Sequence, residues 1–396
     1  MAATTRTYLD YNASAPLLDE ARAAMLAALD QPGNASSVHR EGQFQRRAID
    51  AARRAVATMA GAQPDNVIFT SGSTEAAASL LTPDWTVGRT PYRFTRLLVG
   101  ATEHPALMSG GSFAEADRVV IPVDANGLIR MDALKAALSI TGPDDHTLVA
   151  IQIANNETGV IQDVSALAQV IHDAGAFWVA DATQAAGRIP LAVGGAMAPD
   201  AIILSGHKIG GPKGVGAIVH GGEIMRPRAL IAGGGQEKGF RGGTENAPAI
   251  AGFGAAATVA LSDLTTRAGI ASLRNGFEAT LGEIAADCVI HGAGVARLDN
   301  TSFFSIAGIK AETAMIALDL DGIAVSAGSA CSSGKVGRSA VLTAMGYDSA
   351  EGALRVSFGP DNTPDEVQRL VSALLRIVAR RIAQADQKFA VGLEQL

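Results

Sequence analysis

The stretch Asp200–Gly216, which reads Asp-Ala-Ile-Ile-Leu-Ser-Gly-His-Lys-Ile-Gly-Gly-Pro-Lys-Gly-Val-Gly, decides the expected fold. Its apolar run 201–204 predicts a buried β-strand, and the glycines and proline that follow cannot continue a strand or a helix. Ser205, His207 and Lys208 therefore lie at the carboxyl end of a strand, where open α/β sheets bind ligands. A lysine there can form a Schiff base with an aldehyde cofactor, provided that burial or a second cation lowers its pKa. A solvated surface lysine is the alternative, and this stretch alone does not decide between the two.

Strands and helices alternate on both sides of this stretch. We expect strands at 67–70, 96–101, 118–122, 148–153, 177–180 and 215–219, and helices at 17–29, 41–60, 106–116, 131–139 and 163–174. Such alternation predicts an α/β fold, in which a mostly parallel sheet is covered by helices on both faces. Ser36 or Ser37 is expected to cap the helix 41–60, and Asp132 to cap the helix 131–139.

The pattern changes after a long helix expected at 247–263. Short strands expected near 287–290, 301–306, 323–326 and 353–358 alternate there with helices at 311–320, 339–345 and 364–385. This second pattern predicts a smaller α+β domain. We therefore expect a large domain that spans 15–260, and a small domain that combines 1–14 with 261–396.

Composition limits the class of protein and its partners. The chain is 48% hydrophobic and 18% charged, as expected of a packed globular protein, and its net charge of −7 gives no footprint for nucleic acid or an anionic membrane. The first seven residues lack the apolar core of a signal peptide, and no apolar run is long enough to span a membrane. The two cysteines, Cys288 and Cys331, cannot form a disulfide framework or a tetrahedral zinc site on their own. These observations predict a soluble cytoplasmic protein that binds neither nucleic acid nor a membrane.

Polar groups suited to one aromatic ligand follow several of the expected strands. The Ser-Gly-Ser-Thr-Glu turn offers hydroxyls and free N–H groups to an anion, although plain helix capping by Ser73 or Thr74 uses the same geometry. His104 could stack on a flat ring or be an ordinary loop histidine. Asp181, at the end of an apolar strand, needs a partner such as a protonated pyridine nitrogen, a buried arginine or a helix N-terminus. Together with Lys208, this order of groups suggests pyridoxal phosphate, a cofactor that acts as an electron sink.

Features of the second half of the chain also point to chemistry. Cys331 lies in the glycine- and serine-rich loop 326–334, where an exposed thiol is a liability unless it is used. Arg355 is a charge within an apolar strand and needs a carboxylate, either from a substrate or from an internal Asp or Glu. Cys288 is interpreted as a small core hydrophobe. The glycine-rich stretch 233–244 predicts a long functional loop rather than a linker.

Eight short motifs then occur in order along the chain. They are Tyr8-Leu-Asp-Tyr-Asn-Ala-Ser-Ala-Pro16, Phe69-Thr-Ser-Gly-Ser-Thr-Glu75, Thr102-Glu-His104, Asn155-Asn-Glu-Thr-Gly159, Asp181-Ala-Thr-Gln184, Ser205-Gly-His-Lys208, Arg241-Gly-Gly-Thr244 and Gly328-Ser-Ala-Cys-Ser-Ser333. Together they resemble the cysteine desulfurases, members of the class V (fold type I) aminotransferase family, over nearly the whole chain. The last motif is similar to the nitrogen-fixation and iron–sulfur-cluster branch of that group.

The resemblance implies a role for each polar group near the strand ends. Lys208 would carry pyridoxal 5'-phosphate, His104 would stack on its ring and Cys331 would be the nucleophile, so these three are the expected catalytic residues. The expected cofactor-binding residues are Ser73, Thr74, His104, Asn156, Asp181, Gln184, Ser205, His207, Lys208 and, from the partner subunit of a homodimer, Thr244. The expected substrate-binding residues are Asn34, Asn156 and Arg355.

The resemblance also implies an activity. The protein would convert L-cysteine to L-alanine and pass the sulfur, held as a persulfide on Cys331, to an acceptor or scaffold protein for iron–sulfur cluster assembly. A selenocysteine lyase, an aminotransferase or a non-catalytic scaffold are the alternatives, and a transaminase has no need of the thiol. No resident metal is implied, and Cys331 would contact a nascent cluster only transiently. Departures from the family pattern at 76–78, 83–93 and 337–338 leave the identity of the acceptor open.

Overall fold

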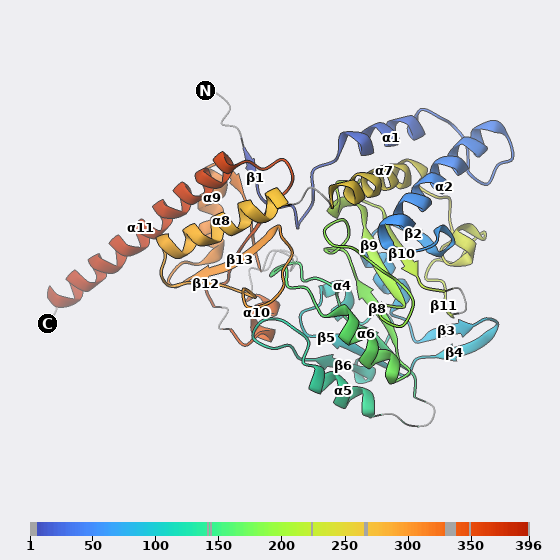
Figure 1. The fold of residues 1–396 in the computed structure, drawn as a ribbon, viewed down its shortest axis with the longest axis horizontal. Helices are drawn as coiled ribbons and strands as arrows, with labels where there is room; N and C mark the ends of the chain where they lie inside the picture. The colour runs from blue at the N-terminus through green and yellow to red at the C-terminus, as the bar shows by residue number, and fades with distance from the viewer. Residues whose placement is uncertain are drawn as a thin grey trace.

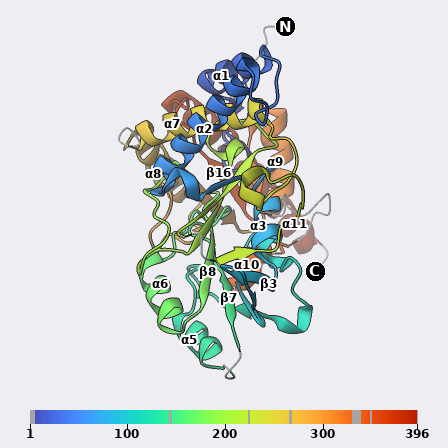
Figure 2. The same ribbon diagram turned by 90° about the vertical axis from the view of Figure 1, so that its right-hand side faces the viewer.

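The computed structural model describes residues 6–140, 142, 145–222, 225–264, 268–328, 338–347 and 350–394. Figure 1 shows a large unit built around one twisted sheet, with a smaller unit of helices and strands beside it, and in Figure 2 the large unit lies in front of the smaller one. The chain from residue 7 to residue 18 runs from the smaller unit into the larger one and connects them (Figure 1).

The secondary structure follows the expected alternation. The helices are α1 (Asp19–Leu29), α2 (Arg40–Ala60), α3 (Ser73–Leu80), α4 (Pro105–Met108), α5 (Met131–Ser139), α6 (Val164–Asp173), α7 (Ala247–Asp263), α8 (Ala268–Ile284), α9 (Ala311–Leu320), α10 (Ala340–Ala344) and α11 (Pro364–Glu394), with 3-10 turns η1 (Pro64–Asn66), η2 (Glu115–Asp117), η3 (Gly206–Lys208) and η4 (Gln236–Gly239). The strands are β1 (Thr7–Tyr8), β2 (Val67–Thr70), β3 (Asp84–Val87), β4 (Thr90–Arg93), β5 (Arg96–Gly100), β6 (Arg118–Ile121), β7 (Thr147–Ala150), β8 (Phe177–Asp181), β9 (Ala201–Ser205), β10 (Gly216–His220), β11 (Met225–Pro227), β12 (Cys288–Ile290), β13 (Thr301–Ile306), β14 (Ile323–Ala324), β15 (Ser326–Ala327) and β16 (Leu354–Ser357).

The central sheet has seven strands in the order β2-β10-β9-β8-β7-β5-β6. Strands β9, β8, β7, β5 and β6 are parallel to one another, whereas β10 is antiparallel to both of its neighbours, β2 and β9. Strand β2 therefore points the same way as β9, and every strand except β10 ends at the same edge of the sheet. The mostly parallel α/β sheet predicted from the sequence is confirmed.

Helices cover both faces of this sheet because successive side chains of a strand point to opposite sides. On β2, Val67 and Phe69 join one buried cluster while Ile68 joins another, and Ile202 and Ile203 of β9 divide in the same way. The first cluster includes apolar side chains of α2, α5, α6 and α7, and the second includes those of α3 and α4. Burial on both sides explains why these strands are continuous apolar runs.

The smaller unit has a hydrophobic core of its own. Its four-stranded antiparallel sheet has the order β12-β13-β16-β15, and α8, α9 and α11 pack against it. Leu9 near the N-terminus belongs to this core, together with Phe277, Leu318 and Leu370. A small domain that combines the N-terminal residues with the C-terminal part of the chain stays a prediction, and so do the boundaries 15–260, 1–14 and 261–396.

Helix α11 is longer than the helix expected at 364–385, and Figure 1 shows it projecting away from the smaller sheet. Among the residues that the structure describes, no helix combines the length and the apolar composition needed to cross a membrane.

The helix expected at 106–116 is wrong. Helix α4 ends at Met108, and only the 3-10 turn η2 follows before β6. Gly110 and Gly111 lie in the left-handed region, with φ of 69° and 56°, where the chain cannot continue a right-handed helix. The alanines after them have helix propensity, but the glycine pair breaks the segment first.

Both expected helix caps are wrong as well. The N-cap of α2 is His39, whose Nδ1 accepts the N–H of Gly42, rather than Ser36 or Ser37. The N-cap of α5 is Arg130, so Asp132 lies inside the first turn and pairs with Arg130 instead of capping the helix. The acidic side chain still lies at the positive end of the helix, where the dipole favours it.

Candidate active site

The carboxyl ends of β2 and β9 border a cavity of about 480 Å³. Because the two strands are parallel and separated only by β10, the residues that follow them meet at one edge of the sheet. The cavity is lined by backbone, hydroxyl and cationic groups: Ala13, Ser14, Ser71, Gly72, Ser73, Thr74, Ser205, His207, Lys213 and Gly214. The hydroxyl groups expected in a phosphate site therefore lie around a single opening.

The N-terminus of α3 faces this opening without a side-chain cap. Gly72 is the N-cap residue and makes no side-chain cap bond, so capping by Ser73 or Thr74 is not observed. Glu75 instead accepts the N–H of Ser71 at 2.8 Å and pairs with Arg241 at 3.0 Å. Burial opposes the ionisation of Glu75, but these hydrogen bonds hold its pKa below the ordinary value. The first turn of α3 is thus fixed while its remaining N–H groups are available to an anion.

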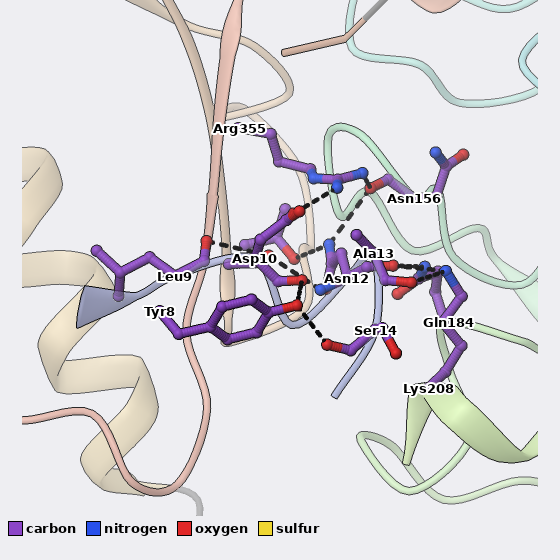
Figure 3. A network of polar contacts seen from close by, with 12 residues as sticks. Tyr8, Leu9, Asp10, Asn12, Ala13, Ser14, Asn156, Gln184, Lys208 and Arg355 are labelled. Atoms are coloured by element: carbon purple, nitrogen blue, oxygen red, sulfur yellow. Dashed lines mark hydrogen bonds and ion pairs between the residues drawn. The ribbon is translucent and has the colours of Figure 1, made fainter. Parts of the chain in front are cut away.

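Lys208 lies on η3, directly after β9, and its amine is held by the N-terminal segment. The Nζ atom donates to the carbonyl oxygens of Asn12 at 2.7 Å and Ala13 at 2.9 Å (Figure 3). The neighbouring His207 places Nδ1 at 3.2 Å from Ser14 Oγ. Burial, followed by the charges of Lys208 and Lys213, lowers the pKa of His207 to about 4. His207 is therefore a neutral hydrogen-bonding group at neutral pH.

His104 and Asp181 lie close to Lys208. The Nδ1 atom of His104 accepts the N–H of Ala106 at 3.1 Å, which leaves the proton of the neutral ring on Nε2. Burial lowers the pKa of His104; the nearby Lys208 also lowers it, and Asp181 raises it. Asp181, the last residue of β8, accepts the N–H of Thr183 at 2.8 Å through Oδ1. An imidazole, a carboxylate and an amine are thus gathered at the strand ends.

The segment that holds Lys208 also binds Gln184 and Arg355 (Figure 3). Gln184 donates from Nε2 to the carbonyl oxygen of Asn12 at 3.0 Å. Arg355, which is 3% exposed, pairs with Asp10 at 2.8 Å and donates to the carbonyl oxygen of Asn156 at 3.0 Å. Of the two partners left open by the sequence, the internal carboxylate is the one observed. The Nε–H of Arg355 has no partner within the described ranges.

A family model for class V aminotransferases matches residues 7–370 of this chain. The chain belongs to the class V aminotransferase family. The chain is similar to a cysteine desulfurase of Cereibacter sphaeroides, with 38% identity over 94% of this chain and 96% of the relative. Another relative is the cysteine desulfurase IscS of Dictyoglomus turgidum, 34% identical over 97% of this chain and 98% of the relative.

Solved structures agree with the family assignment. A NifS-like protein from Rickettsia africae has 30% sequence identity, covers 94% of this chain and 99% of its own, and superposes with a TM-score of 0.84. A structure described as SspA in complex with cysteine has 27% identity, covers 90% of this chain and 100% of its own, and has a TM-score of 0.74. The fold is therefore that of the NifS-like, fold type I members of the class V family.

Of the expected site residues of this family member, Ser73, Thr74, Ser205 and His207 line the 480 Å³ cavity. Lys208 lines a different cavity of about 830 Å³, whereas His104, Asn156, Asp181, Gln184 and Arg355 line neither of the two. Asn34 is exposed between α1 and α2, where its side-chain oxygen accepts the N–H of Ser36 at 2.8 Å. Thr244 is exposed beside a separate cavity of about 140 Å³, which shares Ser71 and Gly214 with the larger one. Cys331 lies outside the described residues.

The sequence interpretation assigned no role to the groups that hold these side chains. The carbonyl oxygen of Asn12 receives hydrogen bonds from both Lys208 and Gln184, and Asp10 pairs with Arg355. Lys213 adds a cation to the cavity wall. The motif 8–16 was the available signal, since it contains Asp10 and Asn12, but nothing local in that motif shows which distant side chains it contacts.

Proposed function

We propose that this class V family member is a cysteine desulfurase, which releases L-alanine from L-cysteine and keeps the sulfur as a persulfide on Cys331. Curated relatives that match nearly the whole chain carry that name, and the SspA structure contains cysteine. The observation that carries the proposal is the convergence of Lys208, His104 and Asp181 at the strand ends, where the preceding residues Ser205 and His207 line the cavity edged with hydroxyls. Sulfur transfer to an acceptor protein for iron–sulfur cluster assembly, in the cytoplasm, is the role we infer.

The residues present fit pyridoxal 5'-phosphate. The open N-terminus of α3, the cation of Lys213 and the hydroxyls of Ser73, Thr74 and Ser205 suit the phosphate, and neutral His207 can donate or accept a hydrogen bond there. Asp181 would hold the pyridine nitrogen, Gln184 the ring hydroxyl, His104 the ring face and Lys208 the aldehyde carbon. When bound, this cofactor delocalises the electrons of the bonds around the substrate Cα.

Lys208 is the base that we assign to the substrate Cα proton. Its Nζ donates hydrogen bonds to the carbonyl oxygens of Asn12 and Ala13. These bonds would keep the amine near the site after the substrate has displaced it from the cofactor. His104 Nδ1 is occupied by the Ala106 N–H, which leaves Nε2–H as the only ring group able to donate a proton or hydrogen bond.

Arg355 is the group that we assign to the substrate carboxylate, together with Asn156. One nitrogen of Arg355 is committed to Asp10 and another to the Asn156 carbonyl oxygen, but a guanidinium has five N–H donors. The unpaired N–H groups remain for a carboxylate. Asp10 would then orient the guanidinium rather than compete for all of it.

Cys331 would attack the substrate as a thiolate. The bond between the substrate Sγ and Cβ breaks, a bond between Sγ and the Cys331 sulfur forms, and the carbon skeleton takes up a proton and leaves as alanine. The net change moves one sulfur atom from cysteine to the enzyme and needs no external oxidant or reductant. A thiol at this position separates a desulfurase from an aminotransferase, which does not need it.

The test uses purified protein supplied with pyridoxal phosphate, L-cysteine and a reductant. We expect alanine and sulfide in equal amounts from the native chain. Cys331→Ser should keep the yellow colour of the cofactor but form no sulfide, and Lys208→Ala should lose the colour. Full activity in Cys331→Ser would contradict the proposal.

A further inference from the structure

Glu157 is a buried acid to which neither the family resemblance nor the proposed chemistry gives a role. It follows Asn156 in the turn after β7, and it is only 6% exposed. The turn is fixed by Asn155, whose Oδ1 accepts the N–H groups of Glu157 and Thr158, each at 2.9 Å. The backbone of Glu157 is thus held rigidly next to the carbonyl group that binds Arg355.

The side chain of Glu157 reaches both ends of the segment that contains Cys331. On one side, Ser339 donates its hydroxyl to Glu157 Oε2 at 2.7 Å. On the other side, Gly328 packs so tightly that a Cβ atom there would lie 2.6 Å from the same Oε2 and 2.8 Å from Phe303 Cζ. One carboxylate oxygen therefore touches the last described residue before 329–337 and a residue just after it.

Each end is also fixed by a hydrogen bond of its own. Gly328 follows β15 and donates its N–H to the carbonyl oxygen of Ala353 at 3.0 Å. Ser339, which is 1% exposed, is the N-cap of α10 and accepts the N–H of Leu342 at 3.1 Å. Since Glu157 belongs to the turn after β7 of the large sheet, its contact with Gly328 joins the two units at this point.

We propose that Glu157 is a positioning residue that holds Gly328 and Ser339, the described residues on either side of Cys331, against the Asn156 turn and thereby limits the reactivity of Cys331. The proposal deepens the desulfurase function and rests on it for the role of the thiol. The contact explains why position 328 is a glycine, because any side chain there would displace the carboxylate or the Phe303 ring.

The contact should respond to pH near neutrality. Burial raises the pKa of Glu157 to about 7, while the Ser339 hydroxyl and the positive charge of Arg355 lower it. Arg355 of β16 is the charged group that faces Glu157, and Asp10 is its own partner; Ser339 and Phe303 are uncharged. When ionised, Oε2 accepts a charge-assisted hydrogen bond from Ser339, which is stronger than the bond to the neutral acid.

The direct test measures the alkylation of Cys331 by iodoacetamide, peptide by peptide, from about pH 5.5 to pH 8.5. In Glu157→Gln we expect the rate at Cys331 to be roughly three- to tenfold higher above pH 8, and equal to that of the native chain at the acid end, where Glu157 is protonated. Cys288 is an internal control, because burial and then the charges of Asp287 and Glu278 raise its pKa to about 11. Glu312→Gln, an exposed side chain in the first turn of α9, is the matched control for the loss of one charge.

Ser339→Ala separates positioning from a direct effect of charge on the thiol, because it breaks the contact and keeps the carboxylate. We expect the same rise in the Cys331 rate, with no further rise in the double variant, since both changes remove the bond between Glu157 and Ser339. Ser339→Ala also removes the N-cap of α10, so Leu342 N–H loses its acceptor in this variant and in the double variant but not in Glu157→Gln. Cys331 rates within about twofold of the native chain in both single variants would overturn the proposal.

Turnover gives a second readout. Glu157→Gln should lower kcat for sulfide formation by roughly tenfold and leave KM for cysteine within about twofold, because the substrate-binding groups are unchanged. A raised KM with unchanged kcat would show that Glu157 acts on substrate binding instead and would overturn the proposal. Absence of sulfide from the native chain would defeat the desulfurase function, whereas the alkylation rates would still decide the role of Glu157.

Discussion

Asp10 and Arg355 form an ion pair between residues that are 345 positions apart in the sequence. Arg355 is 3% exposed, so its charge depends on the Asp10 carboxylate and the Asn156 carbonyl oxygen for solvation. A buried charge that loses its partner is strongly destabilising, whereas an exposed pair contributes little. The pair is therefore as much a part of the fold as of the candidate substrate site.

Replacing Asp10 with alanine should lower the free energy of unfolding by roughly 2–4 kcal/mol, because the Arg355 guanidinium stays buried without a carboxylate. Urea unfolding monitored by circular dichroism measures this. The control is Asp319→Ala, which removes an exposed partner of Arg6 and should cost less than about 1 kcal/mol. Equal losses of unfolding free energy in the two variants would show that the buried Asp10–Arg355 pair stabilises the fold no more than an exposed ion pair does.

Glu157 should make stability depend on pH in a defined direction. The folded chain holds the pKa at about 7, above the ordinary 4.5, mainly through burial, so the protonated acid is favoured in the folded state. The stability that this preference contributes is fully present below about pH 4.5 and is lost as the pH rises through the folded value.

Glu157→Gln stays neutral throughout, so its stability relative to the native chain should rise by roughly 3 kcal/mol between about pH 4.5 and pH 8. Urea unfolding of both chains across that range gives the difference, and Glu312→Gln should show no such trend. A constant difference would mean that Glu157 titrates as an exposed acid does.

Single residues also show the limit of reading this sequence. Strand and turn signals are local, so the sequence can predict that His104, Asp181 and Lys208 follow strands. The structure brings these three residues close together. The carbonyl groups of Asn12 and Ala13 carry no side-chain signal, so their bonds to Lys208 could not be read from composition or spacing. The assigned roles of these residues stay predictions.

Among the elements, the hairpin β3–β4 is the clearest departure from the family pattern expected after α3. Helix α3 ends at Leu80, and β3 pairs with β4 and with β11 in a three-stranded antiparallel sheet. Trp85 of β3 is 3% exposed and packs edge-on against Phe94 and Phe177 with ring centroids 5.4 and 5.1 Å away. The hairpin is thus part of the core on the α3 face of the sheet.

Trp85→Ala should therefore lower the free energy of unfolding by roughly 3–5 kcal/mol, the usual cost of deleting a buried aromatic side chain. Its affinity for pyridoxal phosphate should be unchanged, since Trp85 lines neither of the two cavities near the strand ends. Fluorescence titration of the folded variant and urea unfolding measure the two quantities. A loss below about 1 kcal/mol would mean that the hairpin is a loosely attached surface element.

Element prediction succeeded where the signal was local and failed where two signals competed. Helix α2 ends at Ala60, and its C-cap residue Gly61 has a φ of 66°, as a glycine after a helical run indicates. The segment 106–116 also has helical composition, but Gly110 and Gly111 override it. His39 rather than a serine caps α2, because an imidazole nitrogen can accept the same N–H of Gly42. The path of the backbone before the helix, and not the preference for serine at N-caps, decides which side chain reaches that N–H.

At the scale of the whole molecule, the position of Thr244 bears on the proposed homodimer. Thr244 is exposed and lies beside the smaller cavity rather than in the one lined by Ser73 and Thr74. The loop before it is fixed to its own subunit, since Glu237 is 7% exposed and binds Arg53 at 2.6 Å. A firmly held loop with an exposed threonine suits a residue that reaches a neighbouring subunit.

Hybrid dimers test this arrangement. Thr244→Ala should weaken pyridoxal phosphate binding, and Lys208→Ala should abolish activity. In a hybrid of the two variants, one site combines the native Lys208 of one chain with the native Thr244 of the other. We expect that site to bind the cofactor with native affinity. Affinity equal to that of the Thr244→Ala homodimer would show that Thr244 acts within its own chain.

The most direct measurement is mass spectrometry of the Cys331 peptide after the cofactor-loaded protein has been mixed with L-cysteine without reductant. We predict that this peptide gains a single sulfur atom, that the Cys288 peptide does not, and that alanine appears in step with the gain. Alanine without added sulfur on Cys331, or added sulfur that persists in Lys208→Ala, would contradict the account.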